Sequence, residues 1–318
     1  MRIGELRNTI DGYAEEELRL IIVELYRRTP KKVVEDKDLD RLLKTPHQFL
    51  QDQRRPKVTE LPDLDYLAFE VDGFISDARQ GHYFAPNSFV RKSERPKWRF
   101  HVKRFHRELV TLMQDPVASA EVSRLLERLF DVLCYAEEIH LFSSSEPFQS
   151  IGISKAQFYG DVVIAQRAAA VDQGWIKQAI ETLLRNAGSF GSDMIGQLVD
   201  QFNTNPLREE ALRVIVQVFE HRPKPRERKP NPNDQLDHLA ELALRVCFGL
   251  DEHDRGIAFY HKHHKKWNKE IGVYCLLEIL EEYQLFDLWM REYEAAQRSG
   301  IQPRDQLREK YRQLKRSY

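Results

Sequence analysis

Basic and aromatic residues alternate in the stretch 83–107, and this is where the sequence comes closest to a recognisable binding chemistry. Residues 91–107 hold eight Lys or Arg against one acid, Glu94, a balance of +7. On a helix that begins near Pro96, the apolar side chains lie on one face and a row of cations on another. Cations about one turn apart can contact successive phosphates of a nucleic acid, or an acidic protein surface. The eight candidates are Arg91, Lys92, Arg95, Lys97, Arg99, Lys103, Arg104 and Arg107.

The same stretch also fits an amphipathic helix whose basic face is only solvated. Trp98, Val102 and Phe105 have the spacing of a core stripe, and charge runs commonly face water. We prefer that interpretation and keep the eight residues as a candidate patch for an anionic partner. A protein partner is favoured over a nucleic acid.

Two histidine patterns resemble parts of metal sites. His261 and His264 are three residues apart, and His253 lies eight before His261, but lysines beside them would repel a cation. Glu137 and His140 form a Glu-x-x-His, half of a di-iron pattern, without a second copy on a comparable helix. We predict no metal ligands and no cofactor.

No catalytic motif with a known mechanism is present. The sequence lacks a P-loop, a dinucleotide fingerprint, a Gly-x-Ser-x-Gly elbow, a His-Glu-x-x-His and a Cys-x-x-Cys pair. Residues 188–192 form the best Gly-rich turn before a helix, but no lysine completes a phosphate cradle there. We interpret it as a turn with Ser192 as the N-cap, and we predict that the protein is not an enzyme.

Apolar spacing predicts helices through most of the chain, with core stripes from Trp98 to Leu112 and from Val122 to Leu133. Leu18, Ile21, Ile22 and Leu25 have the spacing of one buried face. Residues 64–75 fit a helix or a short strand, and the helix is favoured. Residues 157–202 predict three helices, whose expected core residues are Phe158, Ile164, Ile180, Leu183, Leu198 and Phe202.

The predicted fold class is all-α, a helical bundle with irregularly stacked helical hairpins and a solenoid-like C-terminal part. Composition shifts divide the chain into five segments: a small N-terminal helical unit (1–50), a linker and irregular segment (51–95), a middle helical bundle (96–220), a Pro-rich basic loop (221–234) and C-terminal helical hairpins (235–318).

The length, charge and cysteine content of the chain indicate the cellular compartment of the protein. The chain has 318 residues and a formal net charge of -1, and it lacks an apolar run long enough to span a bilayer. Its start has no apolar signal-peptide region. Cys134, Cys247 and Cys275 lie far apart in apolar patterns, which favours buried thiols in a reducing compartment. We therefore expect a cytoplasmic protein without a membrane partner.

Two segments resemble parts of an uncharacterised bacterial family of all-helical cytosolic proteins. The first is EEELRLIIVELYRR near the N-terminus. The second joins Phe158-Tyr159, an Ala-rich helix and a Gly-Ser turn that precedes Ile195, Leu198 and Phe202. The resemblance covers residues 14–50 and 120–202, and it implies a helical fold in a bacterial cytosol.

Stacked helices expose long faces that suit peptides or other helices. We expect a non-enzymatic protein-protein interaction module or regulatory scaffold with another protein as its partner. The alternative is a nucleic-acid-binding accessory protein that uses residues 91–107. A metal-dependent enzyme is a third class, kept because the chain has 11 histidines.

Overall fold

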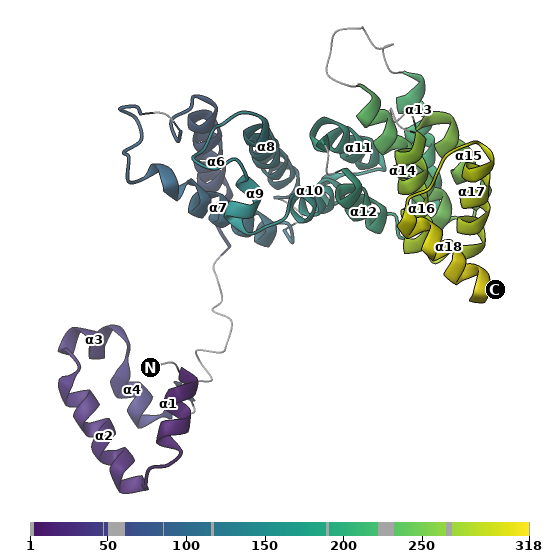
Figure 1. The fold of residues 1–318 in the computed structure, drawn as a ribbon. Coiled ribbons are helices and arrows are strands. Elements are labelled where there is room, and N and C mark those ends of the chain that lie inside the picture. The colour runs from purple at the N-terminus through teal and green to yellow at the C-terminus, as the bar shows by residue number, and fades with distance from the viewer. Residues whose placement is uncertain are drawn as a thin grey trace. The chain divides into compact units, whose positions relative to one another are not determined.

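The computed structural model describes residues 3–46, 48–49, 61–84, 86–115, 118–188, 191–221, 232–264 and 269–317 (Figure 1). All regular structure in these ranges is helical, which confirms the predicted all-α class. The chain forms two compact units, Met1–Leu61 and Pro62–Tyr318. None of the described helices combines the length and apolar character that a bilayer crossing requires.

The N-terminal unit exposes most of its apolar side chains. Its described helices are α1 (Ile3–Ile10), α2 (Glu15–Arg28), α3 (Lys31–Asp36) and α4 (Leu39–Lys44). Acidic residues open α2, where they suit the helix dipole, and Glu17 accepts a hydrogen bond from the Ala14 N–H at 2.8 Å. Tyr26 of α2 donates to Asp40 of α4.

The predicted buried face of α2 is wrong. Leu18 and Ile21 are half-buried, Ile22 and Leu25 are exposed, and α2 has no buried residue. Phe49 is the one buried side chain among the described side chains of this unit. The physical reason is that α2 carries apolar residues on several sides, while the unit has too few helices to cover them.

The large unit begins with α6 (Leu64–Arg79), α7 (Trp98–Leu112), α8 (Ser119–Glu138) and the short α9 (Pro147–Ile151). Asp63 caps α6 by accepting hydrogen bonds from the N–H groups of Asp65 and Tyr66, so the helix favoured for residues 64–75 is confirmed. The stripes predicted from Trp98 to Leu112 on α7 and from Val122 to Leu133 on α8 are buried.

Next come α10 (Lys155–Ala169), α11 (Gly174–Asn186), α12 (Gly191–Gln201) and α13 (Asn205–Glu220), so the predicted three helices of residues 157–202 are confirmed. Their expected core residues are buried apart from Ile164, which is exposed. Ser192 is not an N-cap: α12 already begins at Gly191, and the Ser192 hydroxyl donates to Glu241 at 2.8 Å.

The last helices are α14 (Pro232–Gly249), α15 (His253–His263), α16 (Lys269–Glu282), α17 (Phe286–Arg298) and α18 (Asp305–Ser317). The large unit has two apolar cores, and α14 belongs to both. Leu239 and Leu242 join the larger core, while Leu244 and Phe248 join the smaller one with Trp289. The helix α14 is therefore the shared wall of the two cores.

The remaining sequence predictions have mixed outcomes. Cys134 and Cys247 are buried, whereas Cys275 is half-buried. The Pro-rich loop lies mostly outside the described residues, since α14 already starts at Pro232. The partition into 96–220 and 235–318 stays a prediction.

Candidate interaction surfaces

The structure divides the predicted basic patch. Arg95 donates to the carbonyls of Val90 (3.1 Å) and Asn87 (3.2 Å), which ties down the loop before α7. The other engaged cations pair with carboxylates: Lys97 with Glu94 at 2.9 Å, Arg104 with Glu70 at 2.7 Å and Arg107 with Glu108 at 4.0 Å. These residues hold structure and are only partly available to a ligand.

Six cations of the patch are exposed, and four of the six are not paired with any described acid. Arg91, Lys92, Arg99 and Lys103 form no ion pair with any acid in the described part of the chain. The guanidinium of Arg99 lies 5.0 Å from the centre of the Phe100 ring. Phe69, Phe89 and Phe100 are exposed as well. Exposed cations and rings together can contact a phosphate backbone and stack on bases.

A pair of the buried His106 and the half-buried Asp161 joins α7 to α10, and sequence reasoning missed it. His106 Nε2 lies 2.8 Å from Asp161 Oδ2, and the ring packs on Phe158. No described hydroxyl or thiol hydrogen-bonds the ring, so the pair lacks the nucleophile of a triad. The signal was available: His106 follows Val102 by one turn on the buried side of its helix.

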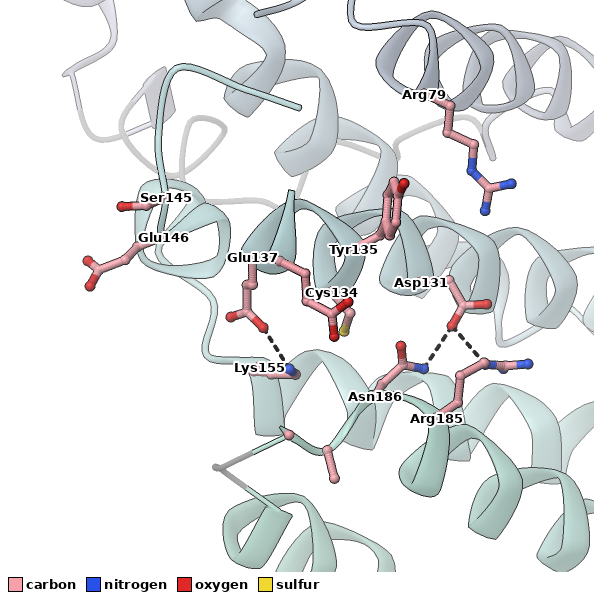
Figure 2. A pocket seen from close by; sticks show the side chains of 13 residues that line it. Arg79, Asp131, Cys134, Tyr135, Glu137, Ser145, Glu146, Lys155, Arg185 and Asn186 are labelled. Carbon is pink, nitrogen blue, oxygen red and sulfur yellow. Dashed lines mark hydrogen bonds and ion pairs between the residues drawn. The ribbon is translucent and has the colours of Figure 1, made fainter. Parts of the chain in front are cut away.

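A cavity of about 790 Å³ lies beside α8, and its lining residues also come from α6, α10 and α11. Figure 2 shows the side chains that line it. Its charges mix both signs. Lys155 pairs with Glu137 at 2.6 Å, and Asp131 accepts from Asn186 at 2.8 Å and faces Arg185 Nε at 3.4 Å. Burial raises the pKa of Asp131 above its ordinary value despite these partners.

Cys134 lines the same cavity without the features of a reactive thiol. Burial raises its pKa far above the ordinary value, so the thiolate is not formed near neutral pH. The opposite signs around it cancel much of any field on a ligand. The cavity therefore has the space for a small molecule but no activated nucleophile.

Glu127, one turn before Asp131 on α8, fastens α8 to α10 and α11. Its carboxylate accepts from Gln166 (3.2 Å), Gln178 (2.7 Å), Thr182 (3.1 Å) and Arg185 (2.7 Å). Burial raises its pKa, but these hydrogen bonds outweigh burial and leave the pKa lowered. An ionised carboxylate held this fully by donors is a structural anchor, because it has no acceptor position left for a substrate.

The histidines near residue 261 point to different carboxylates. His261 Nε2 lies 2.7 Å from Glu292, whose pKa is lowered chiefly by that hydrogen bond. His264 faces Asp237 at 3.9 Å and stacks on Tyr260. These residues border a cavity of about 390 Å³.

Metal-like groupings are missing from the described ranges. No three His, Cys, Asp or Glu side chains lie there in a position to hold an ion. Of the Glu-x-x-His pair, Glu137 binds Lys155 and His140 stacks on Phe84. The third functional class, a metal-dependent enzyme, gains no geometric support.

Among the described helices of the N-terminal unit, α2 exposes several large apolar side chains. The exposed fractions are 71% for Leu20, 48% for Ile22, 60% for Val23 and 62% for Leu25. At about 100° per residue, Leu20 and Val23 lie on one side of the helix, and Ile22 and Leu25 lie on nearly the opposite side. A helix with apolar groups on two sides normally has neighbours on both.

No protein-family model matches the chain, and neither a curated protein nor a solved structure matches it. The resemblance to an uncharacterised bacterial family therefore reduces to the helical character of the chain.

Proposed function

We propose that this protein is a non-enzymatic interaction protein whose N-terminal unit docks on another protein. The supporting observation is the exposed apolar surface of α2. Among the described side chains of its unit, Phe49 is the one that is buried. Burial of apolar area is the main source of stability for a small domain. A unit that leaves this area exposed gains stability from a partner that covers it.

The cavities favour the same class of function. The larger one contains a thiol that burial keeps protonated near neutral pH and two carboxylates, Glu137 and Asp131, that already face Lys155 and Arg185, which supports recognition over nucleophilic catalysis. We therefore infer that the cavity suits ligand recognition better than catalysis.

Affinity capture with the full chain as bait tests the proposal. We expect one defined protein in near-stoichiometric amount, and the double substitution Ile22→Asp/Leu25→Asp should remove it. Val171→Asp is the control, because Val171 is an exposed apolar residue as well but lies in the large unit. Recovery of the bait alone under gentle conditions would contradict the proposal.

Nucleic-acid binding is the second candidate, and one observation favours it. Arg99 and Lys103 are exposed and lack acidic partners in the described ranges, and the Arg99 guanidinium lies 5.0 Å from the centre of the exposed Phe100 ring. Single-stranded nucleic acids bind to such combinations by phosphate contacts and base stacking.

Fluorescence anisotropy with a labelled single-stranded oligonucleotide tests this candidate. We expect binding that weakens steeply with salt, and R99E/K103E should weaken it by at least about tenfold. The control R95E removes a cation that serves the fold. A signal that is flat at low salt ends the nucleic-acid alternative.

A further inference from the structure

One side of α2 has the residue pattern of a helix that pairs with itself. Glu16, Leu20, Val23 and Arg27 follow one another at spacings of four, three and four residues, which is the seam spacing of a two-helix coiled coil. All four side chains are exposed in the N-terminal unit. The half-buried Leu18 and Ile21 lie on another side of the helix, which packs within the unit.

The order of charges along this seam is self-complementary. In an antiparallel pair centred between Ile21 and Ile22, Glu16 of one helix lies opposite Arg27 of the other. Leu20 then lies opposite Val23. The acidic first turn of each helix meets the basic last turn of its partner, and the two helix dipoles oppose each other. A two-fold axis repeats every one of these contacts.

The polar residues of the seam do not already have strong partners. Arg27 pairs within α2 with Glu24 at 3.6 Å, and both side chains are exposed, so this pair contributes little. Glu16 has no ion pair in the described part of the chain. Exchanging these weak local contacts for intermolecular ones therefore costs little.

We infer that the chain self-associates as a two-fold dimer through antiparallel pairing of α2, along Glu16, Leu20, Val23 and Arg27. This inference rests on the proposed interaction function and names a second copy of the chain as one partner. The seam is short, because each copy contributes only two apolar residues, Leu20 and Val23, and two charged residues, Glu16 and Arg27. We expect a weak dimer, with a Kd on the order of 10 µM, because small interfaces mark the low end of stable association.

Sedimentation equilibrium of the full chain over a range of concentrations tests the inference. We expect a reversible monomer and dimer equilibrium, which L20D/V23D weakens by at least about 100-fold. The matched control is I22D/L25D, which adds the same two charges to the same helix on its other side and should leave the Kd within about threefold. A monomer at about 200 µM, or equal effects of the two variants, would overturn the inference.

A charge exchange keeps the test independent of folding. E16R places a cation against Arg27 of the second copy, and R27E places a carboxylate against Glu16. Each variant alone should dimerise about tenfold more weakly, while an equimolar mixture should form a heterodimer close to wild-type affinity. A mixture no tighter than the single variants would contradict antiparallel pairing.

The two proposals fail separately. A monomeric chain that still captures a defined protein through Ile22 and Leu25 removes only the dimer. A dimeric chain that captures no other protein removes the heterologous partner and keeps self-association.

Discussion

The helices α2 and α8 are both rich in apolar residues, yet the structure uses them in opposite ways. The α8 helix buries ten residues, including Leu125, Leu129 and Phe130, between α6, α7 and α10. The α2 helix buries none of its residues and exposes Leu20, Val23 and Leu25. Apolar content therefore does not distinguish a core helix from an exposed one. The number of neighbouring helices does.

The comparison extends to polar contacts. Ion pairs of α8 join distant helices, as when Arg124 and Arg128 both bind Asp72 of α6. Among the described residues, the ion pairs of α2 stay within the helix and are exposed, as between Arg19 and Glu15. Pairs of the second kind contribute about 0–1 kcal/mol. In the described part of the N-terminal unit, Phe49 is the one buried side chain, and Tyr26 of α2 hydrogen-bonds Asp40 of α4, so its helices are held together by less buried apolar surface than those of the large unit.

Hydrogen exchange should show the largest difference between the two helices. Amides of α8 should open with a free energy near that of global unfolding, whereas amides of α2 should open at least about 3 kcal/mol more easily, a factor of more than about 100 in rate. Mass-spectrometric exchange on the full chain measures this. Equal protection of α2 at low protein concentration would show that the unit is stable without a partner.

Truncating one leucine in α8 and one in α2 should change the free energy of unfolding of the large unit by very different amounts. Leu129→Ala should lower the free energy of unfolding of the large unit by about 2–5 kcal/mol, since it opens a cavity in the core. Leu25→Ala should change that unfolding by less than about 0.5 kcal/mol. Urea titration followed by tryptophan fluorescence reports on the large unit alone, because all four Trp lie beyond residue 62.

Two glycines of α12, Gly191 and Gly196, test how closely this helix packs on its neighbours. A Cβ on Gly191 would lie within 3.0 Å of the ring of His238, which itself contacts the Gly188 carbonyl. Gly191→Ala should therefore cost about 1–3 kcal/mol. Gly196→Ala in the same helix meets no atom within 4 Å and should stabilise by about 0.5–1 kcal/mol. Equal effects of the two changes in thermal unfolding would contradict this contact.

Glu127→Gln should lower the free energy of unfolding by an amount that depends on pH. Burial is outweighed by hydrogen bonds, so the pKa of Glu127 is lower in the folded state than in the unfolded chain. Its contribution is fully present above the unfolded pKa of about 4.3 and is lost as the pH falls through the folded pKa. We expect a cost of about 1–3 kcal/mol at pH 7 that shrinks below about pH 4. Urea titrations at both pH values measure this, and a constant cost would contradict it.

The sequence predicted best where a helix has one apolar side. The stripes of α7 and α8 were confirmed because each has a polar side that fixes its orientation. Ile164 and the α2 face were wrong because these helices are apolar on several sides, and periodicity then leaves the buried side undetermined. Spacing also indicates nothing about what covers a helix.

The candidate sites depended on contacts that are distant in sequence. Nothing near Arg104 indicates that Glu70 neutralises it, and nothing near His106 indicates Asp161. The basic patch could therefore be located from the sequence, but its available cations could not. The self-complementary order of α2 was readable throughout, but it gained meaning only when the structure left that side exposed.

The shared wall formed by α14 has a consequence for synthesis on the ribosome. The side of α14 that carries Leu239 and Leu242 can close the larger core as soon as the helix emerges. The side that carries Leu244 and Phe248 must wait for Trp289 and Leu314, which are made about 2 to 13 s later at typical rates of about 5–20 residues per second. During that interval the nascent chain displays a finished domain with one apolar wall open, which is the form that a chaperone would meet.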